Sequence, residues 1–96
     1  MQLSYLYILK CSDNTYYTGV TSNLYKRVEE HESGKHNNSY TYKRRPVALV
    51  FYAEFTDITI GIAKEKQVKK WSKAKKEALI EGRFDDLPNL AKKKFK

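Results

Sequence analysis

The sequence predicts an α+β fold in which a small, three-stranded, mainly antiparallel sheet is flanked by helices. Apolar and aromatic segments of strand length alternate with segments of helical periodicity, in the order strand, strand, helix, strand, helix, helix. The chain has 96 residues, 41% of them hydrophobic and 31% charged, which suffices for one domain with a modest core. We assign residues 1–82 to this domain and residues 83–96 to a basic tail.

The first two strands are predicted to form a hairpin. Residues 3–11 are apolar and aromatic, residues 12–15 have turn chemistry, and residues 16–20 form a second short strand. One face of this hairpin carries Tyr5, Tyr7, Leu9, Cys11, Tyr17 and Gly19. The tyrosines fit simple cross-strand packing as well as chemistry. The lone Cys11 fits a buried spectator thiol, with a catalytic thiol as the alternative.

The helix that follows has an unusual inward face. Thr21 or Ser22 can cap it and Gly34 can end it. The stripe with the spacing of a buried face consists of Leu24, Arg27, Val28 and His31. A buried arginine without a partner costs several kcal/mol. We therefore expect either a carboxylate inside the fold or a cleft that receives an anion.

The second half of the chain contains a loop, a strand and two helices. The polar loop over residues 35–46 holds His36, two tyrosines and three cations, and either contacts bases or is solvated: Tyr40, Tyr42, Lys43, Arg44 and Arg45. Residues 47–55 are almost continuously apolar, as in a central strand covered on both faces. Asp57 can cap a helix that runs to about residue 71, and Ser72 can cap another that stops at Gly82.

The net charge of +8 is concentrated in residues 64–96. This asymmetry favours a polyanionic partner, with nucleic acid first and an anionic membrane surface second, and a solvated helix face as the simpler alternative. No stretch approaches the roughly 18 apolar residues of a membrane span, and no secretory signal is present. We therefore expect a cytoplasmic protein with no membrane partner.

A carboxylate lies at the border of two faces of the helix after Asp57. On a helical wheel, Ile60, Val68 and Trp71 share one face, and the other carries Lys66, Lys69, Lys70 and Lys73. Glu65 falls between them, where it can lean over the sheet and hold a hard divalent cation that keeps several waters. The alternative is an ion pair with Lys69 at i+4.

The order of these residues resembles the GIY-YIG nuclease superfamily. The likeness rests on Tyr5-Leu6-Tyr7, then Tyr17-Thr18-Gly19, then Arg27 with His31, then Glu65 in a basic helix. It runs from about residue 3 to residue 80 and is closest to short bacterial proteins that consist of this domain alone. Tyr5 stands where the first motif of the family has Gly. Many members carry an Asn after the last helix, whereas residues 81–84 read Glu-Gly-Arg-Phe and Asn89 lies farther along.

This resemblance implies a divalent-metal-dependent endonuclease that hydrolyses DNA phosphodiester bonds, directed by DNA shape in repair or recombination. Tyr7 would be the general base, Tyr17 would orient water or phosphate, and Gly19 would keep the strand end open. Arg27 would neutralise the phosphate, His31 would hydrogen-bond to phosphate or tyrosine, and Glu65 would hold a single Mg²⁺ or Mn²⁺.

The distribution of cations along the chain predicts the binding residues. The residues expected to hold phosphates are Lys43, Arg44, Arg45, Lys66, Lys69, Lys70 and Lys73. DNA is expected rather than RNA, with a protein partner for targeting. The alternative function is a non-catalytic nucleic-acid-binding protein on the same fold, which the unmatched Asn favours. Such a binder needs the lysines but has no use for a buried carboxylate beside phosphate.

Overall fold

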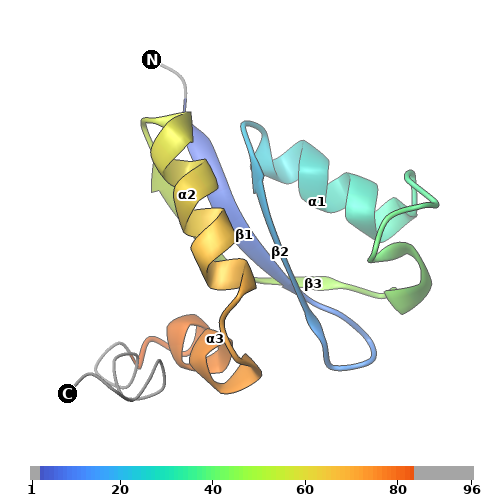
Figure 1. Cartoon of the computed structure of the whole chain (residues 1–96). Coiled ribbons are helices and arrows are strands. Elements are labelled where there is room, and N and C mark those ends of the chain that lie inside the picture. The colour runs from blue at the N-terminus through green and yellow to red at the C-terminus, as the bar shows by residue number, and fades with distance from the viewer. Residues whose placement is uncertain (1–2, 84–96) are drawn as a thin grey trace.

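A computed structural model describes residues 3–83 of the chain (Figure 1). Its centre is a three-stranded antiparallel sheet of β1 (Ser4–Lys10), β2 (Tyr16–Thr21) and β3 (Ala48–Phe55), in the order β2-β1-β3. Three helices follow the strands in the predicted order, namely α1 (Leu24–Ser33), α2 (Ile58–Lys69) and α3 (Lys73–Ile80). A 3₁₀ turn, η1 (Tyr42–Arg44), lies in the loop after α1. The predicted α+β fold class is confirmed.

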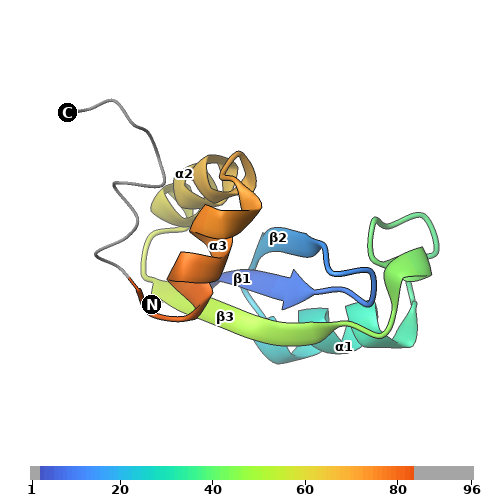
Figure 2. The same cartoon turned by 90° about the horizontal axis from the view of Figure 1, so that it is seen from below.

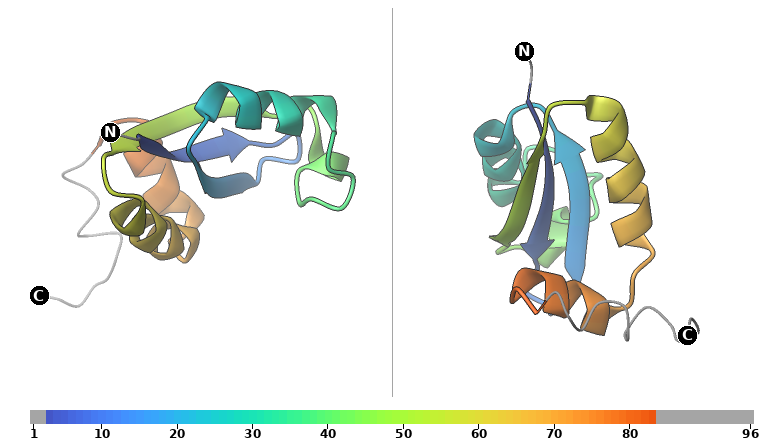
Figure 3. Two further views of the ribbon diagram at one scale, coloured as in Figure 1. Left: turned by 90° about the horizontal axis from the view of Figure 1, so that it is seen from above. Right: turned by 90° about the vertical axis from the view of Figure 1, so that its left-hand side faces the viewer.

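The helices cover the two faces of the sheet separately, as Figures 2 and 3 show. On one face, the buried Tyr7, Leu9 and Cys11 of the hairpin pack against Leu24 and Val28 of α1. On the other face, Leu6, Ile8 and other apolar side chains pack against Val68 of α2 and Leu79 of α3. The alternation of inward residues along β1 thus builds two small cores, one on each side of the strand.

The central strand is β1, so the prediction of a central strand over residues 47–55 is wrong. β1 lies between the other two strands, whereas β3 has β1 on one side only. Leu49 and Tyr52 of β3 are exposed although they are large and apolar. The apolar composition of this segment predicted burial on both faces. That prediction is wrong, because several of its apolar side chains lie at the surface.

Each of the three helices begins directly after a residue whose side chain caps its first turn. Asn23, which directly follows the predicted candidates Thr21 and Ser22, caps α1 and accepts from the amide of Lys26 at 3.1 Å. Gly34 ends α1 with φ of 75°, a conformation that glycine adopts without strain. Asp57 caps α2 and Ser72 caps α3, as predicted.

The junction of α2 and α3 breaks the predicted lysine face. α2 ends at Lys69, and Lys73 is the first residue of α3, so the four lysines do not lie on one continuous helix. Trp71 lies between the helices and packs against the core beneath them, with the Lys75 ammonium 3.9 Å from its ring centroid. Ile60, placed inward by the wheel, is exposed, and Gly61 faces the sheet instead. No helix within residues 3–83 has the length and apolar character that a membrane crossing needs.

Candidate active site

The site is centred on the phenol of Tyr7, which lies across Gly19 on the neighbouring strand. The two residues are directly paired in the β1–β2 ladder. A Cβ at position 19 would be 2.5 Å from the Tyr7 hydroxyl and 2.6 Å from its Cζ atom, closer than any real contact. Gly19 therefore makes room for the Tyr7 side chain, a more specific role than the predicted open strand end.

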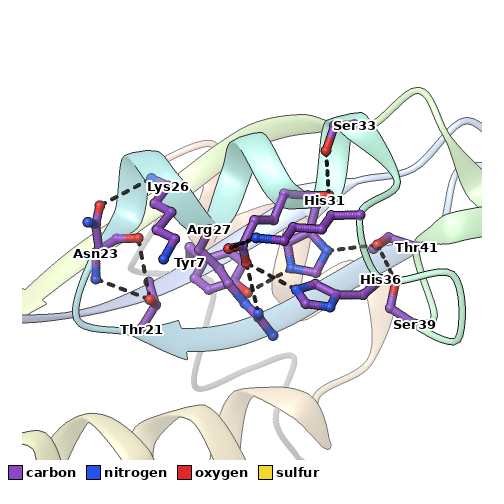
Figure 4. A network of polar contacts seen from close by, with 12 residues as sticks. Tyr7, Thr21, Asn23, Lys26, Arg27, His31, Ser33, His36, Ser39 and Thr41 are labelled. Atoms are coloured by element: carbon purple, nitrogen blue, oxygen red, sulfur yellow. Dashed lines mark hydrogen bonds and ion pairs between the residues drawn. The ribbon is translucent and has the colours of Figure 1, made fainter.

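The Tyr7 hydroxyl belongs to a buried line of hydrogen bonds that runs from β1 through α1 to the following loop (Figure 4). It lies 3.0 Å from Nε2 of His31, whose Nδ1 lies 2.7 Å from Oγ1 of Thr41. Thr41 is fully buried, and its hydroxyl lies 3.2 Å from that of Ser39. The loop after α1 thus holds the His31 ring on its Nδ1 side, opposite the Tyr7 hydroxyl.

The neighbours of Tyr7 favour one arrangement of protons along this line. The guanidinium of Arg27 lies close enough to the Tyr7 hydroxyl to lower its pKa, and a guanidinium can only donate. The hydroxyl is therefore free to donate its own proton, and Nε2 of His31 lies at the distance of an acceptor. Neutral His31 then carries its proton on Nδ1 and donates it to Thr41.

Burial is the main cause of the pKa shifts of Tyr7 and His31. It raises the pKa of Tyr7 from 10.0 to about 12, although Arg27 acts in the opposite direction. Burial, together with the positive charge of Arg27, lowers the pKa of His31 from 6.5 to about 4. At neutral pH the pair consequently consists of a neutral phenol and a neutral imidazole.

Arg27 finds a carboxylate on its own helix. Its guanidinium lies 3.3 Å from Glu30, which also receives Lys35 at 3.7 Å and His36 at 3.2 Å. Hydrogen bonds from His36 and Arg27 lower the pKa of the Glu30 carboxyl. Of the two expectations for the inward arginine, the carboxylate is present. Because Arg27 shares the Glu30 carboxylate with Lys35 and His36, Glu30 does not fully neutralise the charge of Arg27.

Tyr17 stands among aromatic rings beside this network. Its ring centroid lies 5.0 Å from that of His31, 6.2 Å from that of Tyr7 and 6.0 Å from that of Tyr40, on which it stacks. Arg44 lies 3.9 Å from the centroid of the Tyr40 ring. The loop tyrosine thus packs against the site residue Tyr17 and is not a freely solvated side chain.

Glu65 lies on α2, which covers the other face of the sheet from α1 (Figure 3). Its side chain is 12% exposed and its carboxylate lies 3.0 Å from the Lys69 ammonium, so the i+4 ion pair is present. The pKa of Lys69 is raised by Glu65 first and also by Tyr17, while the pKa of Arg27 is raised by Tyr7 first and also by Tyr17. Tyr17 therefore lies near both Arg27 of α1 and Lys69 of α2.

The donor set around Glu65 permits only a weakly held metal ion. Within the described part of the chain, no three His, Cys, Asp or Glu side chains cluster to hold one. Mg²⁺ is commonly bound by one or two carboxylates, with waters and substrate oxygens completing its shell. Glu65 fits that donor chemistry, provided that the exposed Lys69 ammonium moves off the carboxylate.

The other predicted binding residues divide into free and engaged side chains. Lys43, Lys66, Lys70 and Lys73 are exposed. Arg44 bonds to Asp13 at 3.1 Å and to the Tyr40 carbonyl at 2.8 Å, while Arg45 bonds to the Tyr42 carbonyl at 2.9 Å and covers Gly34. The two arginines thus brace the loop, and their contact with nucleic acid stays a prediction. Tyr5 lies outside the network and packs edge-on against Tyr52 at 6.3 Å.

A comparison with protein families decides the identity of the fold. Residues 3–78 match the model of the GIY-YIG catalytic domain, which accounts for most of the chain. The chain belongs to the GIY-YIG family. Asn89, the distant candidate for the family Asn, lies outside the described residues of this GIY-YIG protein.

Curated relatives of this GIY-YIG chain carry names that state no activity. It is 52% identical over 81 residues to a UPF0213 protein of Syntrophus aciditrophicus (strain SB), covering 83% of this chain and 92% of the relative. It is 42% identical over 77 residues to the UPF0213 protein YazA of Bacillus subtilis (strain 168), covering 80% and 77%. These relatives support a small protein built mainly of the GIY-YIG domain.

Two solution NMR structures share the fold of this GIY-YIG chain. The UPF0213 protein BH0048 of Bacillus halodurans is 34% identical with a TM-score of 0.54, over 95% of this chain and 99% of that one. The protein EF2693 of E. faecalis is 28% identical with a TM-score of 0.60, over 88% of each chain.

Proposed function

We propose that this chain is a divalent-metal-dependent endonuclease that hydrolyses DNA phosphodiester bonds. The observation that carries the proposal is the buried line Tyr7, His31 and Thr41, which ends beside the guanidinium of Arg27. A line that only stabilised the core would not need its phenol beside a partly exposed arginine. Arg27 can pair with a phosphate, and the phenol can take part in proton transfer next to it.

The raised pKa of Tyr7 determines how the phenol acts. With a pKa of about 12, only ~10⁻⁵ of the phenol is ionised at neutral pH, so a preformed phenolate is a poor base. The attacking water instead gives its proton to the Tyr7 oxygen while the phenolic proton moves to Nε2 of His31. His31 is available for this step because its lowered pKa keeps the ring neutral at neutral pH, so that one ring nitrogen can accept a proton. Thr41 is a positioning residue, since it holds the ring through Nδ1.

The remaining groups stabilise charge. Arg27 neutralises the charge that builds on the phosphate oxygens, and Tyr17 orients the water or phosphate from the adjacent strand. A Mg²⁺ or Mn²⁺ held by Glu65 would supply Lewis-acid stabilisation of the leaving oxygen. The exposed lysines of α2 and α3 position flanking phosphates without reading bases. This favours recognition of DNA shape, as in repair or recombination.

A cleavage assay on single-stranded, duplex, flap and junction DNA with Mg²⁺ tests the proposal. We expect cleavage that EDTA abolishes, a loss of roughly 100-fold or more in Tyr7→Phe, and no cleavage in Glu65→Gln. Tyr52→Phe is the matched control, because Tyr52 loses the same hydroxyl at the surface and outside the site. Wild-type rates in Glu65→Gln would remove the metal role, and wild-type rates in Tyr7→Phe would remove the relay.

The second candidate is a non-catalytic nucleic-acid-binding protein. It is favoured by the ion pair in which the Lys69 ammonium lies 3.0 Å from the Glu65 carboxylate, because this carboxylate is the proposed metal ligand. Under this alternative, the wild-type protein binds DNA in the same assay but cleaves none of the four substrates. Lys69→Met separates the two cases, because freeing Glu65 should lower the Mg²⁺ concentration that cleavage needs and leave a pure binder inactive.

A further inference from the structure

A groove with an aromatic wall and an acidic rim runs between α1 and β3, away from the Tyr7 network. One half, of about 470 Å³, is lined by Leu24, Tyr25, Val28, Glu29, Glu32 and Leu49. The other half, of about 420 Å³, shares Leu24 and Tyr25 and adds Tyr5, Ser22, Asn23, Tyr52 and Glu54. We call the two halves together the α1–β3 groove.

The aromatic side chains of the groove are open to solvent. Tyr25 is 82% exposed and Tyr52 is 53% exposed, and Leu49 is exposed beside them. Single exposed apolar residues are ordinary, but a contiguous set that lines a groove marks an interaction site. Tyrosine is also a residue type enriched in protein interfaces, because it offers a large contact area with a polar end.

The charge of the groove is opposite to that of the whole chain. Glu29, Glu32 and Glu54 line it, and no lysine or arginine does. Among residues 3–83, none of these three carboxylates takes part in an ion pair. In a chain of net charge +8, three unpaired carboxylates on one groove repel phosphate and attract a cationic partner.

The adjacent strand edge indicates how such a partner would bind. β3 pairs with β1 alone, so its outer edge is unpaired within the described part of the chain. Its sequence, Ala-Leu-Val-Phe-Tyr-Ala-Glu-Phe, has one charge and neither lysine nor proline, the residues that usually protect an edge. Such an edge accepts an extended segment as an additional strand, whose alternate side chains point to one face of the sheet.

We propose that the α1–β3 groove and the β3 edge bind an extended basic segment of a partner protein. The segment pairs with β3 and directs its cationic side chains toward Glu54, Tyr52 and the α1 rim, while its apolar side chains, which alternate with them, point to the opposite face of the sheet. Tyr25 and Glu29 face this groove, whereas Arg27 and His31 are absent from its lining and His31 is directed at the Tyr7 hydroxyl. The bound segment therefore leaves the Tyr7 network open, and the proposal does not depend on catalysis.

The test uses the full chain and three capped eight-residue peptides, followed by amide NMR. The first alternates Lys and Val, the second alternates Glu and Val, and the third is the Lys–Val peptide with alternate amides N-methylated to block strand pairing. We expect the first to shift amides of β3 and α1 and to bind at least about tenfold more tightly than the other two. Equal binding of the Glu–Val or the N-methylated peptide overturns the proposal.

Variants locate the binding surface. Changing Glu29, Glu32 and Glu54 together to Gln should weaken the Lys–Val peptide about tenfold or more, whereas Glu81→Gln, an exposed acid outside the groove, should not. Binding weaker than about 1 mM to the wild-type chain overturns the proposal. So does a dimer in sedimentation that Tyr52→Ser dissolves, since the groove would then hold a second copy. Duplex DNA that shifts the groove amides overturns it as well.

Discussion

The Tyr7 phenol and the Cα of Gly19 occupy adjacent strands so closely that a methyl group at position 19 would be 2.5 Å from the Tyr7 hydroxyl. Gly19→Ala must therefore displace the phenol from His31. We expect a loss of about 1–3 kcal/mol in the free energy of unfolding and cleavage as low as that of Tyr7→Phe. Chemical denaturation and the cleavage assay measure the two effects.

Gly61→Ala is the control for this substitution. A Cβ at Gly61, in the middle of α2, would lie 3.5 Å from Val20 and 3.6 Å from Phe55, which is ordinary packing distance. Removing a helical glycine should then stabilise the protein by about 0.5–1 kcal/mol and leave cleavage unchanged. Similar stability changes in the two variants would show that the space around Tyr7 is not the limiting feature.

Acid should destabilise the fold through His31. Its pKa is about 4 in the fold and 6.5 ordinarily, so the unfolded chain takes up the proton first as the pH falls. The contribution is complete above pH 6.5 and is lost as the pH falls toward 4, by roughly 3 kcal/mol in total. Denaturation of wild type and His31→Gln between these pH values gives the difference.

Thr41 should determine which nitrogen of His31 carries the proton. Thr41→Val keeps the shape but removes the acceptor for Nδ1–H, which should cost about 1–3 kcal/mol and shift the tautomer toward Nε2–H. Nitrogen-15 NMR of the ring reads the tautomer directly, and cleavage should fall roughly tenfold or more. Thr41→Ser should restore both. Wild-type tautomer populations in Thr41→Val would mean that the threonine only fills space.

Lys66 and Lys70 should contribute to DNA affinity and not to the rate of cleavage. Lys66 and Lys70 are exposed, and changing both to Gln should reduce the slope of log affinity against log salt by nearly two, at about 0.9 for each phosphate contact. All DNA sequences should weaken alike, with little change in cleavage at saturating DNA. Lys10→Gln, on the exposed end of β1, is the control. An unchanged slope in the double variant would place the DNA elsewhere.

Local sequence patterns predicted the elements well and their neighbours less well. The caps at Asp57 and Ser72 and the stop at Gly34 depend on single residues, so each could be predicted from its own side chain. At the start of α1, three consecutive residues can cap, and only the backbone path selects Asn23. The predicted central position of β3 was wrong, because the order of strands in a sheet depends on which strands pair, and composition carries no information about pairing.

The site shows the same division. Arg27 and His31 share one face of one helix, so their i+4 spacing is enough to place them together. Glu30 lies three residues after Arg27, and this i+3 spacing was an available signal for the ion pair. Thr41 had none, because it lies in a loop without periodicity and reaches His31 only through the path of that loop.

Trp71 gives the chain a built-in optical reporter for one layer. It is the only tryptophan, and it packs at the α2–α3 junction with a lysine ammonium over its ring, on the face of the sheet opposite α1. Its fluorescence should follow the environment of that face, while the tyrosine network lies on the other. A substitution near Tyr7 that leaves tryptophan emission unchanged has acted locally, so the chain reports which half of itself a perturbation has reached.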